Sequence, residues 1–338
     1  MKERANHNRD VHVSEDHIKA TYVQRWGNAT SIALLDPQCK IFNVAGIDGV
    51  IGYRDEPTCV VVFGDPMCEP DNMNKLAQAF YDFCAHQKKT IVYAVISHHF
   101  MKILKEQNVW SLIEIGNELI LNPQNDPRMR TGNYANLLRR KSNYALRDGI
   151  HVKEYTGQNR DTEKMIEEVA DVWLKGRKGS QIYLVQVNMF AGRSNKRYFY
   201  AEDSHTGAMI GVLMLTRLDA YQGWVINLLI TVPGAASYVS EVLALSALDT
   251  LRAENCPYFS TGMVPDNRLG IIEGLHPITT WILRRVYGIV SRWYRLPDRM
   301  RYWKKFAPAQ RPTYLAFSKE RFKLKDVFSI MRAFHAKV

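Results

Sequence analysis

The sequence lacks long apolar runs. No stretch of about 18 apolar residues, the length that a helix needs to cross a bilayer, occurs in its 338 residues. We therefore expect no membrane-spanning helix and predict that any membrane contact is peripheral. The polar start, Met1 to Asp16, contains no apolar signal segment. No Cys-x-x-Cys pair occurs among the five cysteines, which are Cys39, Cys59, Cys68, Cys84 and Cys256. These absences favour free thiols in a reducing cytoplasm.

Motifs for metal binding and covalent catalysis are also missing. The adjacent pair His98-His99 lacks the spacing of metal ligands, and neither Cys68 nor Cys256 lies in a nucleophile signature. The chain has no Gly-x-Ser-x-Gly elbow. We therefore assign no metal and no resident cofactor.

Acidic residues are too few to balance the basic ones. Asp and Glu number 34 against 45 Lys and Arg, which gives a formal net charge of +11. Such a charge attracts polyanions such as RNA, phosphorylated cofactors and acidic lipid surfaces. It predicts a class of partner and says nothing about the fold.

What the sequence does contain is enough apolar material for a full core. Hydrophobic residues make up 46% of the chain and aromatic residues 11%. A chain of 338 residues is about right for two domains, at roughly 100 to 200 residues each. We therefore predict two lobes, with a lead-in over residues 1–20, where no sustained period is present.

Short apolar runs alternate with amphipathic stretches, which is typical of α/β proteins. In the first lobe, residues 21–150, we predict three helices: one through 76–84 capped by Asp71 or Asn72, one capped by Ser97 that runs to about Gln107, and a basic helix at 134–147 that stops at Gly149. The predicted strands are at 58–63 and 90–96, with two short strands within 112–121 around Gly116-Asn117.

The second lobe, residues 151–338, repeats this order. We predict a strand at 150–155, a helix at 162–175, strands at 197–202, 208–216 and 224–231, and a helix at 238–253. The polar turn at 204–207 makes the strands on either side of it a hairpin. The order and lengths of these elements predict two tandem acetyltransferase-like lobes, each with a mixed central sheet flanked by helices, the first lobe being a degenerate copy.

Six short islands in a consistent order resemble the C-terminal domain of the phosphatidylglycerol lysyl- and alanyltransferases. They are Gly64-Asp65-Pro66, Ile115-Gly116-Asn117-Glu118, Leu138-Arg139-Arg140 with Asn143 and Gly149, Trp173 to Lys178, Gly262-Met263-Val264-Pro265, and Lys305 to Pro308 with Pro312 to Ala316. The resemblance runs from Tyr22 to Ser318. It implies an enzyme that takes an aminoacyl group from aminoacyl-tRNA and transfers it to a lipid hydroxyl of the phosphatidylglycerol type.

The chain departs from the family at four positions. On the strand 224–231 the family usually has an Asp and, three residues later, an Arg, and this sequence has Asn227 and Ile230. In the terminal island the family's Trp and Arg correspond to Gln310 and Thr313. A non-catalytic module that binds RNA or an anionic membrane is therefore one alternative to the enzyme.

An aminoacyl ester is already activated, so its transfer requires a positioned acceptor and stabilisation of the tetrahedral oxygen. As catalytic candidates we take Lys305 and the Tyr314 hydroxyl, with Asn227 as an orienting amide. For substrate binding, the resemblance and the loop described below suggest Trp173, Lys175, Arg177, Thr231, Gly234, Gly262 and Met263.

The segment 276–317 is both basic and aromatic, with Asp298 as the acidic residue among nine basic ones between 284 and 311. Cations bind phosphates, and aromatic rings stack on bases or lie at a headgroup interface. Together with a second patch at 139–141, this segment predicts a surface that binds the phosphates of tRNA or lipid. Its residues are Arg139, Arg140, Lys141, Arg284, Arg285, Arg292, Arg295, Arg299, Arg301, Lys304 and Arg311.

The loop Thr231 to Ala236 favours a different donor. It lies between a predicted strand and a predicted helix and matches, except at its first position, the loop with which acetyltransferases hold the pyrophosphate of acyl-CoA. Pro233 removes one of the amides of such a loop. An acyl-CoA-dependent N- or O-acyltransferase is therefore the second alternative. For each enzyme hypothesis we expect a cytoplasmic protein, peripheral at the inner face of the membrane where its acceptor is a lipid.

Overall fold

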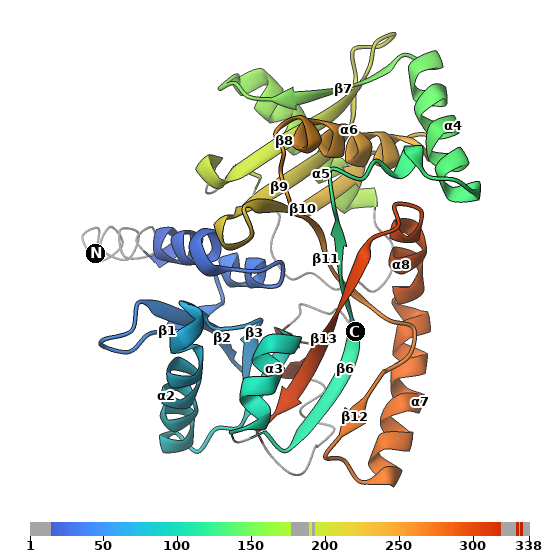
Figure 1. The fold of residues 1–338 in the computed structure, drawn as a ribbon. Coiled ribbons are helices and arrows are strands. Elements are labelled where there is room, and N and C mark those ends of the chain that lie inside the picture. Colours follow the sequence, from blue (N-terminus) through green and yellow to red (C-terminus); the bar gives the residue numbers. More distant parts are fainter. Residues whose placement is uncertain are drawn as a thin grey trace.

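The computed structural model describes residues 15–107, 109–176, 189–190, 193–318, 329–330 and 332–333. Within them the strands form one 13-stranded sheet, which runs the length of the molecule (Figure 1). The strands are β1 (Lys40–Phe42), β2 (Gly49–Asp55), β3 (Val60–Phe63), β4 (Met67–Cys68), β5 (Ile91–Ser97), β6 (Ser111–Leu121), β7 (Ile150–Tyr155), β8 (Lys196–Asp203), β9 (Met209–Leu218), β10 (Gly223–Thr231), β11 (Phe259–Pro265), β12 (Ile272–Glu273) and β13 (Ala309–Phe317).

Helices cover both faces of this sheet. After a first helix at 15–26 they are α2 (Met73–His86), α3 (His98–Lys105), α4 (Asn133–Arg147), α5 (Arg160–Gly176), α6 (Val239–Ala253), α7 (Pro277–Trp293) and α8 (Leu296–Lys304). Short 3-10 turns are η1 (Ser31–Leu35), η2 (Pro70–Asn72), η3 (Pro127–Met129), η4 (Arg193–Asn195) and η5 (Asp219–Tyr221). The α/β prediction with a mixed sheet flanked by helices is confirmed. Among the described residues no helix combines the length and apolar character needed to span a membrane.

The same unit occurs twice along the chain. In the first half, β3, α2 and β5 form a strand, a crossover helix and a parallel strand, and in the second half β10, α6 and β11 do so. A helix and a long strand follow each unit, α3 and β6 in the first half, α7 and β13 in the second. The two halves are therefore tandem copies of one topology.

The two long strands are exchanged between the halves. In the sheet order β1-β2-β3-β5-β13-β6-β11-β10-β9-β8-β7, β13 of the second half lies between β5 and β6, and β6 of the first half pairs with β11. β6 and β13 also pair antiparallel with each other in the centre of the molecule (Figure 1). Each half thus completes the sheet of the other.

The core follows from the apolar faces of these elements. In the first half, Leu76, Phe80 and Cys84 of α2 share one buried cluster with strand residues such as Val62 and Tyr93. In the second half, the apolar residues of α6 pack with α4 and α8 on one face of the sheet, while α5 covers the other. The boundary at residue 150 remains a prediction, and α4, which precedes it, contacts α6 and β7.

Two elements differ from expectation. Residues 112–121 form the single strand β6, because Gly116 is a point of close approach and does not turn the chain: a Cβ there would lie 2.3 Å from the carbonyl oxygen of Val264 on β11. Residues 15–20, which were predicted to belong to the lead-in, are part of a helix over 15–26. Tyr22, Val23 and Trp26 of this helix pack in one core cluster, and Lys19 is also buried, with its amino group paired with Glu15 at 3.1 Å.

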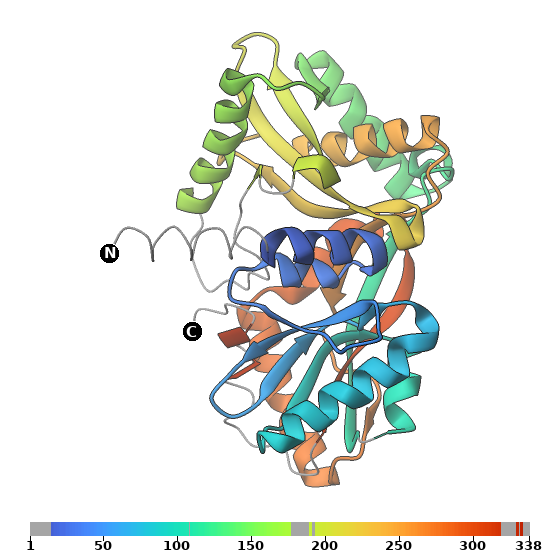
Figure 2. The same cartoon turned by 90° about the vertical axis from the view of Figure 1, so that its left-hand side faces the viewer.

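The first helix lies between the upper and lower parts of the sheet (Figures 1 and 2). Gln24 donates a hydrogen bond to Asp219 of η5 at 2.8 Å, and Arg25 pairs with Asp48 at 2.7 Å. It therefore connects the strands of both halves on one face of the molecule.

Candidate functional site

The parallel strands β10 and β11 separate near the centre of the sheet. They are paired at Trp224 with Phe259 and at Val225 with Ser260, although β10 continues to Thr231 and β11 to Pro265. Beyond Val225 and Ser260, residues 226–231 and 261–265 are not paired with each other. Facing strand edges without mutual hydrogen bonds can bind an extended ligand through main-chain groups.

Irregularities in both strands begin where the pairing stops. The register of β10 with β9 shifts between Ile226 and Leu228, which makes Asn227 the extra residue of a bulge. The register of β11 with β6 shifts between Ser260 and Met263, and Gly262 there has a φ of +82°. We name this region, residues 226–231 with 261–265, the open pair.

A buried carboxylate lies beside the open pair. Glu118 of β6 accepts hydrogen bonds from the hydroxyls of Tyr258 and Ser260, the latter at 2.8 Å. The amide of Gly262 donates to the Ser260 hydroxyl at 3.1 Å, which links the carboxylate to the bulge of β11. Burial, reinforced by the charge of Glu118, raises the pKa of Tyr258 far above its usual value, so this phenol stays protonated as a donor.

A second carboxylate approaches from the first half. Asp65 follows β3 and accepts a hydrogen bond from the amide of Ser97 at 2.8 Å. Burial raises the pKa of Asp65, and the charge of Glu118 adds to the increase, while Ser97 and His99 oppose it. Burial also raises the pKa of Tyr221 to about 12, with Glu118 and Asp65 contributing. The two acids therefore lie within electrostatic reach of each other.

Tyr221 completes this group from η5. Its ring stacks on that of Tyr258 with the centroids 4.6 Å apart. Arg311 of β13 lies opposite Glu118 of β6 in the strand register, and its side chain is exposed. We name Asp65, Glu118, Tyr221, Tyr258 and Ser260 the junction cluster, because it lies where the strands of both halves meet. Its charge is negative in a chain that is otherwise basic.

A row of polar side chains crosses the second half next to the open pair. Asn227 donates a hydrogen bond to the Thr216 hydroxyl at 3.3 Å, and Thr216 is the register partner of Lys196. Burial lowers the pKa of Lys196 to about 8. Its amino group donates a hydrogen bond to the carbonyl of Met189 at 3.3 Å. Lys196 lies on β8, which β9 separates from β10.

The three catalytic candidates come from different places. Asn227 lies in the open pair, as described. The Tyr314 hydroxyl lies 3.1 Å from Nδ1 of His98 in the core of the first half, where Tyr314 is buried. Lys305 is paired with Glu241 of α6, which also accepts from Lys141 at 2.6 Å, and it lies over the ring of Tyr302. The structure thus brings Lys305 to Lys141 and leaves Tyr314 apart from both.

The substrate-binding candidates lie on both sides of the open pair. Trp173 packs against the cluster that contains Ile230 of β10, and the backbone at Gly176 approaches the side chain of Pro233, next to Gly234. Thr231 ends β10, Gly262 and Met263 lie on β11, and Lys175 is exposed at the end of α5. Arg177 lies outside the described residues. The described candidates other than Lys175 therefore border one region of the sheet.

The predicted phosphate-binding residues lie on two helical surfaces, except Arg311, which lies on β13. Arg139, Arg140 and Lys141 belong to α4. Arg139 donates to the carbonyls of Arg128 and Arg130, and Arg140 is exposed. The residues from Arg284 to Lys304 belong to α7, α8 and the turn between them, where Arg284 donates to the carbonyls of Leu269 and Gly270. Arg295 and Arg301 both pair with Asp298, each at 3.3 Å.

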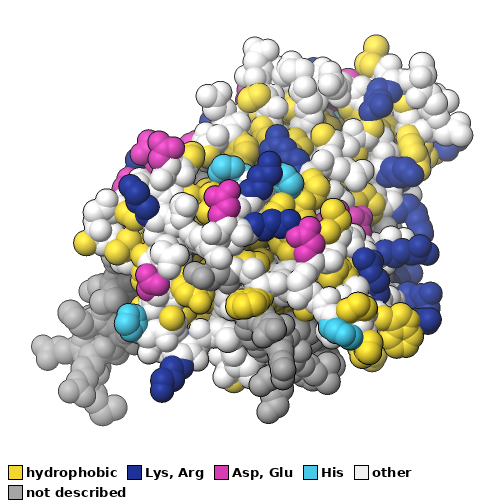
Figure 3. All heavy atoms as spheres, turned by 60° about the horizontal axis from the view of Figure 1, so that its bottom comes forward, with side chains coloured by type: hydrophobic (Ala, Val, Ile, Leu, Met, Phe, Trp, Pro, Cys, Tyr) yellow, Lys and Arg dark blue, Asp and Glu magenta, His cyan; other side chains and the backbone are white. Residues whose placement is uncertain are grey.

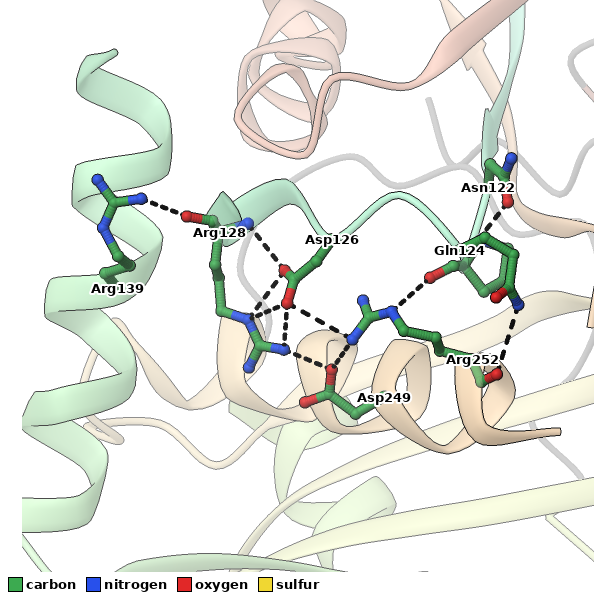
Figure 4. Close-up of polar contacts among 8 residues, drawn as sticks. Asn122, Gln124, Asp126, Arg128, Arg139, Asp249 and Arg252 are labelled. Atoms are coloured by element: carbon green, nitrogen blue, oxygen red, sulfur yellow. Dashed lines mark hydrogen bonds and ion pairs between the residues drawn. The ribbon is translucent and has the colours of Figure 1, made fainter. Parts of the chain in front are cut away.

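A surface groove of about 730 Å³ lies away from the open pair. It is lined by Gln124, Asn125, Asp126, Met129, Arg130 and Arg252. Figure 4 shows that Asp126 and Asp249 pair with Arg128 and Arg252 next to it. These ion pairs connect the loop after β6 to α6, and they neutralise two of the basic residues near the groove.

Sequence reasoning missed the junction cluster and Lys196. Asp65 and Glu118 both belong to islands of the family resemblance, and a carboxylate within such an island was the available signal. Tyr221, Tyr258 and Ser260 carry no comparable signal, because their role depends on strands that are distant in sequence. Within the described ranges no group of three or more His, Cys, Asp and Glu side chains is arranged to hold a metal ion.

Comparison of the sequence with known families gives one match over most of the chain. The family model described as "Phosphatidylglycerol lysyltransferase, C-terminal" matches residues 21–317. Phosphatidylglycerol lysyltransferases from two strains of Staphylococcus epidermidis are each 22% identical to the chain over 295 residues. These matches cover 86% of this chain and 34% of each relative, so the chain spans about a third of the length of the curated relatives it matches.

Solved structures share the fold. The C-terminal domain of an Agrobacterium fabrum protein assigned as a lysylphosphatidylglycerol synthetase superposes with a TM-score of 0.74 at 17% identity, covering 95% of this chain and 96% of that one. The structure titled "L-PGS from Bacillus licheniformis" gives a TM-score of 0.73 at 16% identity, with coverage of 94% and 96%. Both structures therefore share nearly the whole fold of this chain.

Proposed function

The chain belongs to the family of phosphatidylglycerol lysyltransferase C-terminal domains, and from this membership we propose that it transfers an aminoacyl group from aminoacyl-tRNA to a hydroxyl of a lipid headgroup of the phosphatidylglycerol type. The observation that carries the proposal is the open pair beside the junction cluster. It combines unpaired strand edges, which can hold an extended donor end, with two carboxylates that attract an amino group.

The proposed reaction needs no protein nucleophile. The headgroup hydroxyl attacks the ester carbonyl, a new ester bond forms to the headgroup oxygen, and the bond to the terminal ribose of the tRNA breaks. The proton of the attacking hydroxyl ends on the ribose oxygen that leaves. We assign this proton transfer to Asp65, because burial raises the pKa of its carboxyl group above the ordinary value.

The protein's remaining contribution is electrostatic and positional. Glu118, held by Tyr258 and Ser260, is placed to attract the ammonium group of the aminoacyl moiety. The side-chain amide of Asn227 provides a hydrogen-bond donor at the point where the strands separate. Fixed donors of this kind stabilise the tetrahedral oxygen, each by about two to three powers of ten in rate.

The direct test is transfer of a labelled amino acid. Protein is incubated with labelled aminoacyl-tRNA and vesicles that contain phosphatidylglycerol, and label is measured in the organic phase with and without ribonuclease. We expect ribonuclease-sensitive transfer. Glu118→Gln keeps an acceptor for Tyr258 and Ser260 but removes the charge, and it should lower transfer at least about a hundredfold.

The matched control is Glu168→Gln on the exposed face of α5, which should leave transfer unchanged. Absence of transfer with every amino acid would reject the proposal. If the protein still bound RNA or anionic vesicles with strong salt dependence, the non-catalytic module would replace it. The positions Asn227 and Ile230, where the family usually carries charges, motivate that alternative.

The loop between β10 and α6 supports the second candidate function, an acyl-CoA-dependent acyltransferase. It leads from the open pair to the N-terminus of α6, where the helix dipole favours an anion. Two of its amides, those of Ala235 and Val239, already donate to carbonyls within the loop at 3.1 and 3.0 Å. A thermal shift with CoA esters tests this function, and no stabilisation at millimolar ligand would exclude it.

A further inference from the structure

Helix α7 carries an apolar face that packs against nothing else among the described residues. Its large exposed side chains and their exposed fractions are Ile278 (64%), Trp281 (60%), Ile282 (50%), Val286 (36%), Ile289 (62%) and Trp293 (68%). At 3.6 residues per turn these positions form one stripe. The opposite face of α7, with Leu283 and Tyr287, packs on the sheet. Within the described part of the chain, the stripe therefore faces outward.

Cations border this stripe. Arg285 and Arg292 lie on α7 between Trp281 and the aliphatic residues of the stripe, and the guanidinium of Arg285 lies 5.3 Å from the ring centroid of Trp281. From residue 277 to 304 the sequence has seven Lys and Arg against Asp298. Figure 3 shows the combination, an apolar patch at the right-hand edge beside a row of Lys and Arg side chains. An apolar surface of this size is unusual on a protein that is bare to water.

We propose that the outer face of α7, with the cations of α8, docks on the surface of an anionic lipid bilayer. Amphipathic helices with tryptophan and aliphatic residues on one face and Arg or Lys beside it lie in the plane of the interface. The two tryptophans of the stripe, Trp281 and Trp293, suit the headgroup level. An anionic bilayer complements this surface, because it offers an apolar layer to the stripe and negative charge to the cations.

RNA fits this surface less well. Ile278, Ile282 and Ile289 are aliphatic, and they offer neither stacking nor hydrogen bonds to bases. Helix α4, which is also basic but whose exposed apolar residues Tyr134, Tyr144 and Leu146 form no comparable stripe, is better suited to a phosphate backbone. The two basic surfaces thus have different partners.

The inference rests on the proposed function for the identity of the lipid, but its test does not require turnover. Protein is sedimented with vesicles of phosphatidylcholine alone and with vesicles that contain phosphatidylglycerol. We expect binding to the anionic vesicles that weakens as salt increases. The double variant Ile282→Glu with Ile289→Glu should reduce the partition coefficient at least about tenfold, because it places two carboxylates against the anionic surface.

The matched control is Leu146→Glu on α4, where an exposed apolar residue of another basic helix changes in the same way. It should leave vesicle binding unchanged, and circular dichroism should show both proteins folded, because all three positions are exposed. The inference is overturned if the wild type does not sediment with anionic vesicles, or if the double variant binds them as well as the wild type does. A double variant that loses tRNA binding or self-association while still binding vesicles would assign the surface to RNA or to a second copy. Loss of label transfer with intact vesicle binding would instead reject the proposed function alone.

Discussion

The two parallel strand pairs of the molecule have the same topology and different structures. In the first half, β3 and β5 are paired at four successive positions from Val60 with Ile91 to Phe63 with Ala94, and the amide of Gly64 extends the ladder to Ala94 at 2.9 Å. In the second half, β10 and β11 separate after two pairs. One copy of the unit thus closes its sheet and the other leaves it open.

The residues of the two pairs also differ in character. All four residues of β3 are buried and apolar, so the strand gains most by staying within the ladder. In the open pair, Asn227 interrupts the apolar pattern of β10, and Gly262 supplies a left-handed backbone position to β11. The closed pair contributes stability, and we infer that the open pair supplies the binding site.

The largest expected effect on stability is in the first half, which contains the closed pair β3–β5, and it should leave the reaction unchanged. Phe80 of α2 is fully buried between the strands of the first half and the ring of Phe42. Phe80→Ala should lower the free energy of unfolding by about 3–5 kcal/mol, through lost burial and a cavity. Urea titration measures this, and transfer per folded molecule should be unchanged. A lower rate per folded molecule would mean that the closed half also takes part in the reaction. Tyr134→Ala, at an exposed aromatic of α4, is the control.

The crossover helices also differ, because α6 begins with a buried carboxylate. Glu241 accepts from Lys141 and Lys305. Burial alone raises the pKa of Glu241, but the two lysines more than offset it, so the pKa lies below the ordinary 4.5. The carboxylate therefore stabilises the fold above pH 4.5, and this contribution is lost as the pH falls through the folded-state pKa.

Glu241→Gln should lower the free energy of unfolding by about 3 kcal/mol at pH 7, because it leaves two partly buried cations without a counter-charge. Unfolding measured from pH 7 to 3 should show a weaker pH dependence in the variant than in the wild type. An equal pH dependence in both would show that other carboxylates determine the acid limit. Glu202→Gln, at an exposed pair with Lys153, should have little effect on stability.

The smallest expected effect on stability compares two glycines. Gly262 in the open pair has a φ of +82° and Gly46, between β1 and β2, has a φ of +84°, and a Cβ at either position would meet no atom within 4 Å. Replacing either glycine by alanine should lower the free energy of unfolding by the same amount, about 1 kcal/mol, because of backbone strain alone. We expect label transfer to fall in Gly262→Ala and to remain unchanged in Gly46→Ala. Equal transfer in the two variants would show that the open pair takes no part in the reaction.

Much of this comparison was accessible from the sequence, because it depends on local pattern. The helical period of α2 and α6 and the apolar run of β3 identify the crossover units, and Ser97 caps α3 as predicted, accepting from the amide of Phe100. The bulge at Asn227 and the end of pairing after Val225 leave no such mark, since they depend on which strand lies alongside.

The position of β6 and β13 was not predictable for the same reason. Gly116 suggested a break between two short strands, whereas its small size allows β11 to approach. The junction cluster depends on that arrangement, because it combines residues from β6, β11, η5 and the end of β3. The sequence therefore indicated some of the residues that could carry chemistry, but which of them lie together became known only from the order of the strands.

The exchange of β6 and β13 also constrains how the protein is made. Residues 309–317 form the strand between β5 and β6. During synthesis the sheet of the first half therefore lacks this strand until almost all of the second half has left the ribosome. Long-range pairing of this kind is slow and exposes strand edges in the interval. A nascent chain stalled before Ala309 should therefore depend on chaperones, and the two halves should reach their native state together and not in the order in which they are translated.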